Sequence, residues 1–488
     1  MQRVAEAVYE HTEEPVRLPD DELVLGAALE LDLLESSNSG IAFSDPDVRR
    51  DYLVRHVADL ALEGWDVPAA FADVIDDAQH RTLTFGARRE VTTIVLVVLA
   101  REHGKDVVGR MGEVARLEFD GEGRNDPFWA MYRPFCKALP ELAVEPRELA
   151  DTLDVAFEAI SNDLAGGFIY GSVEKLAARS QADAEALYRV FASRPDSPAV
   201  SFTANALVGL ANFDLPEAHR RALDLTDSEQ PSLRRSGIAA FGRFDYASGG
   251  RPELLGPTWE RLQALKATRG PEIGQALARA YGDLLDQKPE ATEALVELAA
   301  RPDPVTQHQV GAILSMQDDE ARREPWYRSA LLRLAGVPTS HSGTWRELDH
   351  RAFDCAKDDP ELAVEFMEAV VLGHDYSARR EEGELPELLG STFSELMVNH
   401  PEVLEAAVMR WFASDESRLH LAARDVVRYS QGHTIDGGPP WPKLSKPVLD
   451  DQPGPCGVHM HLSTALGSFY LVNMDMLPLT PRQGFMYI

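Results

Sequence analysis

PAVSFTANALV at residues 198–208, PSLRRSGIAAF at 231–241, PEIGQALARAY at 271–281 and PVTQHQVGAIL at 304–314 are four copies of one helical pattern. Each copy begins at a proline, and successive prolines are 33, 40 and 33 residues apart. Positions 2, 6, 9 and 10 after each proline carry apolar or small residues, which form one stripe of a helix with 3.6 residues per turn. The stripe residues are Val200, Ala204, Leu207, Val208, Leu233, Gly237, Ala240, Phe241, Ile273, Leu277, Ala280, Tyr281, Thr306, Val310, Ile313 and Leu314.

A second helix precedes each proline, because an apolar residue also stands six positions before it. A stripe that recurs every 33–40 residues is typical of stacked helical hairpins. The stripe returns after Pro360 and Ser417. The sequence therefore predicts an all-α chain in which residues 66–430 form an α-solenoid of HEAT-like hairpins, clearest at residues 187–317.

Residues 1–65 differ from the repeats and predict a small winged-helix-like unit. Helices are expected at residues 2–11 and 21–34. A hairpin follows, with strands at 33–35 and 41–43 around the turn-forming residues SSNSG at 36–40. A third helix is expected at 47–63, with Pro46 at its first position.

The stretch GIAFSDPDVRRDYLV at 40–54 resembles the end of the winged-helix region in STAND-class signalling ATPases, the NACHT and NB-ARC relatives. In that family a glycine-aromatic strand leads into a helix with an Arg/Gln–Glu/Asp–Tyr–Leu segment. Arg50, Asp51, Tyr52 and Leu53 match that segment, while Asp45 stands where the family often has histidine. The resemblance implies a winged helix followed by helical repeats.

The ATPase domain that precedes the winged helix in that family is expected to be absent. No GxxxxGK[S/T] motif occurs in the sequence, since Gly104 and Lys105 are followed by Asp106 without a glycine-rich lead. Reading of DNA by the N-terminal unit is not expected either. The helix that would enter a groove, at residues 21–32, carries four acidic residues and no basic one.

The formal net charge of the 488 residues is −32 at pH 7. Nucleic acid and anionic membranes bind clustered Lys and Arg, so neither is an expected partner. No apolar run reaches the roughly 20 residues of a membrane-spanning helix, and no secretory signal is present. The three cysteines lie far apart, which argues against a disulfide framework. The sequence thus predicts a cytoplasmic protein.

Two groups of metal-ligating residue types and one acidic loop deserve comparison with known metal sites. They are Cys456, His459 and His461; His341, Glu347, His350 and Asp354; and residues 120–126. The first group has three ligands where structural zinc needs four. The second has neither HExxH nor 2-His-1-carboxylate spacing. The loop lacks the regular alternation and closing glutamate of an EF-hand. No metal, cofactor or catalytic residue is predicted.

Two groups of aromatic residues are candidate partner-binding anchors. Such residues usually pack in the core; the alternative is that they are exposed and insert into a partner protein. In the first group, three rings fall at i, i+4 and i+7, with a tryptophan beside them. The candidates are Phe128, Trp129, Tyr132, Trp326 and Tyr327.

The sequence favours a non-catalytic protein-recognition or scaffold module, similar to the sensor part of a STAND-type ATPase. Stacked hairpins offer an extended surface, and the acidic composition favours a partner with a basic patch. One alternative is a HEAT-like enzyme of the lyase or glycosylase type with a site on the concave face. Nucleic-acid binding there would need a basic stripe, for which Arg234, Arg235, Arg243 and Arg279 are too few.

Residues 431–488 are expected to form an irregular or disordered tail. The sequence GGPPWP at 437–442 breaks any helix. After residue 450 charged side chains become scarce, unlike in the acidic repeats. This change in composition marks the predicted end of the solenoid.

Overall fold

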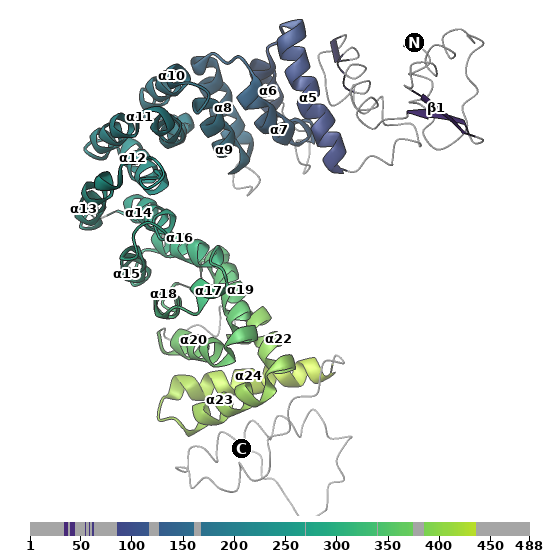
Figure 1. Cartoon of the computed structure of the whole chain (residues 1–488). Helices are drawn as coiled ribbons and strands as arrows, with labels where there is room; N and C mark the ends of the chain where they lie inside the picture. The colour runs from purple at the N-terminus through teal and green to yellow at the C-terminus, as the bar shows by residue number, and fades with distance from the viewer. Residues whose placement is uncertain are drawn as a thin grey trace, which may run out of the picture. The chain divides into compact units, whose positions relative to one another are not determined.

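The computed structural model describes residues 34–37, 40–43, 85–116, 126–160, 167–268, 270–338, 340–373 and 385–435, together with the single positions 54, 58, 61 and 62. These residues are predominantly helical (Figure 1). The chain divides into two compact units, unit 1 at residues 1–257 and unit 2 at 258–488. No helix in the described ranges has both the length and the apolar character needed to cross a membrane.

The four repeat prolines all stand at the first position of a helix, as the sequence predicts. Proline suits this position because its fixed φ matches the first turn and its missing N–H would have no helical partner. The side chains of Ser197 and Asp303 accept hydrogen bonds from N–H groups at the start of two of these helices. The elements are η4 (Pro198–Phe202), α12 (Pro231–Arg243), α14 (Pro271–Asp283) and α16 (Pro304–Ser315).

The predicted stripe is the core of the repeats. Fourteen of its sixteen residues are buried, and the other two, Val208 and Leu233, are half-buried. Each large aliphatic side chain buried in this way contributes about 1.5–3 kcal/mol relative to an exposed one. The hydrophobic period of the sequence is therefore confirmed as the packing period of the fold.

Unit 1 stacks its helices in two rows. Its further elements are α5 (Phe85–His103), α6 (Val107–Ala115), α7 (Asp126–Ala138), η2 (Leu139–Glu141), α8 (Pro146–Ile160), α9 (Phe168–Ala177), α10 (Gln181–Ala192) and α11 (Thr203–Thr226). One row runs α5, α7, α9, α11, and the other runs α6, α8, η4, α12. Helix α10 packs against α8, α9 and α11. Each helix thus contacts helices close to it in the chain, as in a helical repeat.

Helix α11 joins two helices that belong to successive hairpins. Its backbone leaves the helical region at Asp214 (φ −148°, ψ 81°), and Pro216 follows two residues later. The Asp214 carboxylate accepts a hydrogen bond from the N–H of Glu217 at 3.0 Å. The acid therefore caps the second half of α11, and the kink is the point where one hairpin passes into the next.

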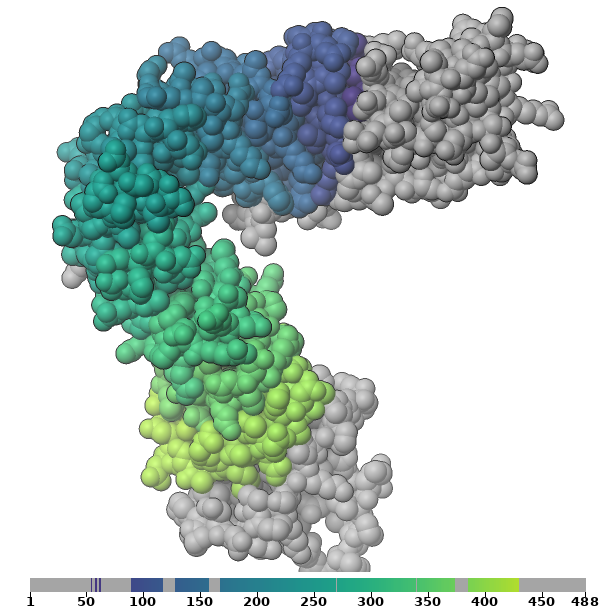
Figure 2. Space-filling view, viewed as in Figure 1, coloured from purple at the N-terminus to yellow at the C-terminus, as the bar shows by residue number. Residues whose placement is uncertain are grey.

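Unit 2 continues the two-row arrangement. Its elements after α14 and α16 include α15 (Ala291–Ala299), α17 (Asp319–Arg322), α18 (Pro325–Leu334), α19 (Ser342–Asp358), α20 (Pro360–Gly373), α21 (Leu385–Leu388), α22 (Gly390–Asn399), α23 (Pro401–Ala413) and α24 (Ser417–Ile435); η5 (Pro252–Leu254) and α13 (Leu255–Lys266) lie at the boundary of the units. Helices α14, α16, α19 and α22 form one row, and α15, α18, α20 and α23 form the other (Figure 1). In the space-filling view these helices abut without gaps (Figure 2).

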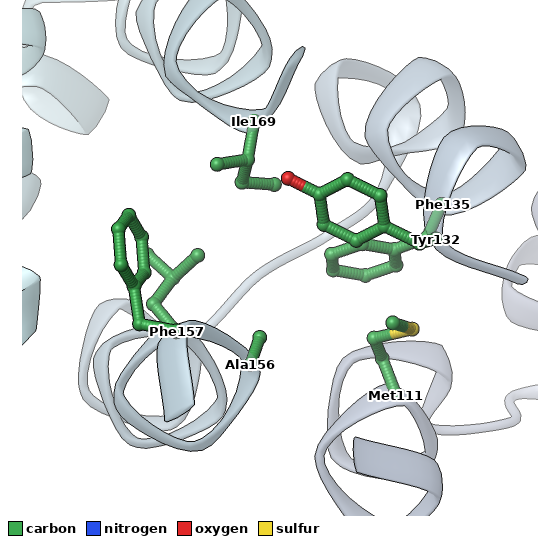
Figure 3. A pocket seen from close by; sticks show the side chains of 7 residues that line it. Met111, Tyr132, Phe135, Ala156, Phe157 and Ile169 are labelled. Atoms are coloured by element: carbon green, nitrogen blue, oxygen red, sulfur yellow. The ribbon is translucent and has the colours of Figure 1, made fainter. Parts of the chain in front are cut away.

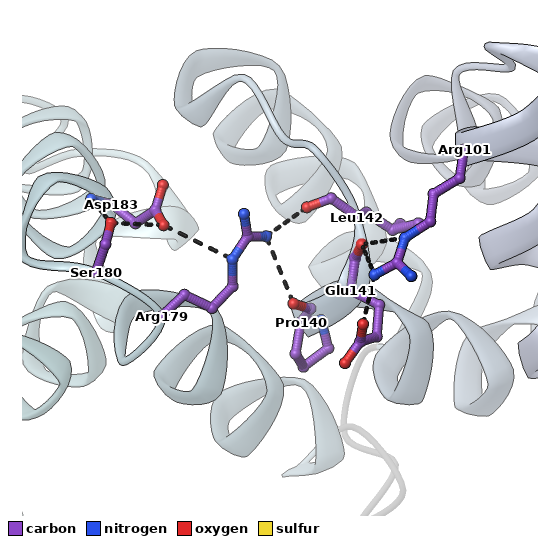
Figure 4. Close-up of polar contacts among 7 residues, drawn as sticks. All are labelled: Arg101, Pro140, Glu141, Leu142, Arg179, Ser180 and Asp183. Atoms are coloured by element: carbon purple, nitrogen blue, oxygen red, sulfur yellow. Dashed lines mark hydrogen bonds and ion pairs between the residues drawn. The ribbon is translucent and has the colours of Figure 1, made fainter.

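Two arginines connect neighbouring helices at the turn after α7 (Figure 4). Arg101 of α5 donates to the carbonyl oxygen of Glu141 at 3.0 Å and pairs with its carboxylate at 2.5 Å. Arg179, just after α9, donates to the carbonyl oxygen of Leu142 at 2.5 Å. Carbonyl groups at a helix end lack helical partners, so these guanidinium groups satisfy them and fix three successive helices of the row around one turn.

The predicted N-terminal hairpin is confirmed. Strand β1 (Leu34–Ser37) pairs antiparallel with β2 (Gly40–Phe43), and Leu34 lies opposite Phe43. Of the predicted helix at 47–63, Val54, Ala58 and Ala61 are helical and buried. The other parts of the predicted winged-helix-like unit at 1–65 lie outside the described residues. So does the predicted tail at 431–488, apart from the end of α24.

Candidate partner-binding surfaces

Two of the three aromatic candidates on α7 lie in the core. Phe128 and Tyr132 are buried, and their rings stack with centroids 5.3 Å apart. Trp129 is half-buried and meets both rings edge-on, at 5.2 and 5.6 Å. Phe128 and Tyr132, at i and i+4, belong to the buried stripe of α7. Trp129 is therefore the member of this trio that a partner could contact.

Tyr132 also lines a small hollow between α6, α7, α8 and α9 (Figure 3). The hollow has no room for a water molecule. Burial raises the pKa of Tyr132, and burial raises the pKa of the adjacent Cys136 thiol to about 12, so both groups stay protonated near neutral pH. This hollow is a packing junction and gives no support to the enzyme alternative. Its lining residues are Met111, Tyr132, Phe135, Leu153, Ala156, Phe157 and Ile169.

The aromatic pair on α18 divides in the same way. Tyr327 is buried, and burial raises the pKa of its hydroxyl. Trp326 is half-buried and contacts the Tyr327 ring edge-on, with centroids 6.0 Å apart. Of the five candidate anchors, three therefore belong to the core, and the two tryptophans keep part of their surface exposed.

Helices α6 and α8 bring together four carboxyl groups that the sequence reasoning did not single out. This carboxylate cluster consists of Asp106, Glu145, Glu148 and Asp151. Asp106 is the N-cap of α6 and accepts a hydrogen bond from the N–H of Gly109 at 2.7 Å. Glu148 lies in the first turn of α8, where the positive end of the helix dipole favours an acid. Asp106 and Glu148 thus each have a local reason to stand at a helix start.

Close packing of α6 on α8 brings these groups into one cluster. A Cβ atom at Gly112 would lie 3.1 Å from the Thr152 hydroxyl, which itself donates to the Val108 carbonyl oxygen at 3.1 Å. A Cβ atom at Gly109 would lie 3.2 Å from a Glu148 carboxyl oxygen. The two glycines on α6 therefore allow the acids of α8 to approach Asp106.

The cluster concentrates negative charge. A hydrogen bond with the Asp106 carboxylate raises the pKa of Glu148, and burial and the charges of Asp106, Glu145 and Asp151 raise this pKa further. Arg194 neutralises one edge by pairing with Asp151 at 2.6 Å. In the sequence, the signal for this cluster is the i, i+3, i+6 spacing of Glu145, Glu148 and Asp151, of which Glu145 immediately precedes α8 and the other two lie on it. The proximity of Asp106 depends on which helices pack together.

No group of three or more His, Cys, Asp and Glu side chains in the described part of the chain is arranged to hold a metal ion. In the candidate group around α19, Asp354 pairs instead with Arg351 at 3.0 Å and with Arg322 at 3.4 Å. His350 stacks with the ring of Phe353. The tail group at 456–461 and the loop at 120–125 lie outside the described residues.

Comparison with known proteins identifies no family. No family model matches the chain, and no curated protein matches it. Among solved structures, the chain is similar to an engineered protein determined by the Northeast Structural Genomics Consortium, at 13% identity and a TM-score of 0.22 over 87% of this chain and 95% of the other. A TM-score this low supports no statement about fold or function.

Proposed function

We propose that this chain is a non-catalytic protein-recognition scaffold whose HEAT-like hairpins bind a partner protein through its basic patch. The observation that carries the proposal is the carboxylate cluster on α6 and α8. A hydrogen bond with Asp106, burial, and the negative charges of Asp106, Glu145 and Asp151 together raise the pKa of Glu148. A lysine or arginine of a partner would relieve that repulsion, so the cluster favours basic ligands over neutral ones.

The charge of the whole chain acts in the same direction. A net charge of −32 attracts basic partners over a distance set by the ionic strength, about 10 Å at 0.1 M salt. Association is therefore expected to be fast and to weaken with added salt. Trp129 and Trp326 belong to the proposal as half-exposed aromatic side chains that can contact a partner.

The proposal includes a relationship to the sensor part of STAND-type ATPases. Its support is the order of the elements: a hairpin at residues 34–43, the family-like segment at 40–54, and helical repeats after it. In such a sensor, recognition of a partner by the repeats is the expected role. The proposed scaffold function does not depend on this relationship.

The experiment compares three forms of the full chain against a fluorescent, Lys/Arg-rich peptide probe. The test variant combines Asp106→Asn, Glu145→Gln and Glu148→Gln; asparagine at 106 keeps the helix cap. The control combines Glu229→Gln, Asp286→Asn and Glu320→Gln, which are exposed acids outside the cluster. Both variants lose the same charge. Fluorescence anisotropy is measured at low and high salt, and circular dichroism checks the fold.

The cluster variant is expected to bind the basic probe at least about tenfold more weakly than the wild type, with a shallower salt dependence, while the control binds nearly as well. Equal weakening of both variants would mean that only net charge matters. In that case the cluster would not be a recognition site.

A further inference from the structure

Helices α7 and α9 are neighbours in one row of unit 1, and a contact between an arginine and an aromatic ring joins them. The guanidinium of Arg133 on α7 lies over the ring of Phe168 at the start of α9, 4.4 Å from the ring centroid. This distance is within the range of a cation–π interaction. Phe168 is 51% exposed, so the pair stands at the surface of the row.

The charge of Arg133 has no anion to balance it. Within the described residues this guanidinium makes no hydrogen bond and no ion pair, although its planar fork of N–H donors fits a carboxylate. Burial and the nearby charge of Arg133 lower the pKa of Arg89 on α5, so a second guanidinium lies close by. Glu90, the acid next to Arg89, has an interaction of its own. A further carboxylate at Arg133 would therefore relieve repulsion between like charges.

Two lysines extend this positive charge along both helices. Lys137 stands one helical turn after Arg133 on α7, and Lys175 stands two turns after Phe168 on α9, so each continues the exposed side of its helix. Both lysines are exposed, and in the part of the chain that the structure describes neither makes a hydrogen bond or an ion pair. We call Arg133, Lys137, Phe168 and Lys175 the α7–α9 patch.

The acids around the α7–α9 patch are few, and the nearest one on α9 is occupied. Glu174 pairs with Arg243 of α12. Asp126 is the first residue of α7, two turns or about 10 Å before Arg133. The next helix of the row, α11, carries no charged residue from Thr203 to Phe213. In a chain with a net charge of −32, this part of the row is therefore locally positive.

We infer that the α7–α9 patch binds an acidic segment of a partner protein, separate from the basic ligand that the carboxylate cluster would bind. One carboxylate of the segment would pair with the fork of Arg133, others would meet the lysines, and an apolar side chain would contact Phe168. A nucleic acid fits less well, because its many phosphates would meet an acidic chain. A second copy would bring the same repulsive charge.

Helix geometry sets the spacing of the acids in this segment. One turn, about 5.4 Å, separates Arg133 from Lys137 along α7, and packed helices such as α7 and α9 lie about 8–10 Å apart. An extended peptide advances about 3.3 Å per residue. The matching segment would carry acidic residues about two or three positions apart, with apolar residues between them.

The test uses the full chain and a fluorescent peptide with three glutamates at that spacing and leucines between them. The test variant combines Lys137→Glu and Lys175→Glu. The matched control, Arg189→Glu with Arg323→Glu, makes the same charge change at exposed positions outside the patch. A further variant, Arg133→Lys, keeps the charge and removes the fork. Fluorescence anisotropy measures binding, and circular dichroism verifies that each variant folds.

The lysine variant is expected to bind the acidic probe at least about tenfold more weakly, and the control nearly as well as the wild type. Arg133→Lys should bind severalfold more weakly at unchanged net charge, because a lysine cannot hold a carboxylate through two parallel hydrogen bonds. The inference is overturned if the wild type does not bind the acidic probe, or if the control loses as much affinity as the test variant. Unchanged affinity of Arg133→Lys would overturn the pairing of a carboxylate with Arg133.

Two further measurements distinguish other occupants. Stronger competition by an RNA homopolymer than by the unlabelled peptide would assign the patch to nucleic acid. A mass that rises with protein concentration and falls in the lysine variant would assign it to a second copy. Either result overturns the inference. The basic probe of the preceding experiment is measured in parallel, so failure at one surface is separable from failure at the other.

Discussion

At the residue scale, Glu148 holds its proton more tightly in the folded state than an ordinary glutamate does. A hydrogen bond with Asp106 and the surrounding charge raise its pKa above the ordinary value of 4.5. Between 4.5 and the raised pKa the folded state binds more protons than the unfolded state, so this group makes the free energy of unfolding decrease as pH rises. Above the raised pKa the full penalty persists.

We therefore expect Glu148→Gln to raise the free energy of unfolding at pH 7. The gain should shrink as pH falls through the raised pKa, because wild-type Glu148 then becomes neutral as well. Urea unfolding of wild type and variant at a series of pH values measures the difference. Glu229→Gln, an exposed acid outside the cluster, serves as the control. A gain that does not change with pH would contradict the assigned cause.

Single residues also show why the sequence did not locate the surfaces. Phe128 and Tyr132 were candidate anchors because of their helical spacing, yet the same spacing places them in the core stripe. Periodicity identifies the side chains that share a face, and burial depends on which helices cover that face. Trp129 lies beside this stripe and keeps part of its surface exposed. The sequence alone could not distinguish the buried rings of Phe128 and Tyr132 from the half-exposed ring of Trp129.

At the scale of helices, the contact of α9 with α11 requires a glycine. A Cβ atom at Gly209 would meet the Ala177 side chain and lie 2.8 Å from the Ala177 carbonyl carbon. Gly171, also on α9, has no atom within 4 Å of such a Cβ position. The two glycines are therefore a matched pair in which only the surroundings of the Cβ differ.

Gly209→Ala is expected to lower the free energy of unfolding by about 1–3 kcal/mol, because the backbone of α9 must move away. Gly171→Ala should raise it by about 0.5–1 kcal/mol, because alanine is the better helix former. Chemical denaturation of both variants checks the opposite signs. Equal effects of the two substitutions would show that α9 and α11 do not pack as closely as described.

Helix starts were predictable, and helix neighbours were not. Each repeat proline begins a helix because proline acts through local backbone geometry. The two halves of α11 meet at Asp214, where the backbone leaves the helical region, and they are the two helices that the repeat pattern predicts between Pro198 and Pro231. The carboxylate cluster needs α6 beside α8. Such proximity follows from tertiary packing, which a single sequence does not record.

At the scale of the whole molecule, the proposed recognition site occupies one part of the chain. The carboxylate cluster lies in unit 1. A solenoid can carry such a local surface, because each helix packs on helices near it in sequence.

The same local packing predicts that damage to the core stays local. Leu277→Ala removes a buried side chain of α14 and is expected to lower the local free energy of unfolding by about 2–5 kcal/mol. Hydrogen exchange should then become faster in α14 and its neighbours α15 and α16, while amides of α5, α6 and α7 keep their protection. Leu372→Ala, at a position 39% exposed, is the control and should change exchange little. Uniformly faster exchange in all helices would mean that the chain unfolds as one cooperative body, and the repeats could not then act as independent binding elements.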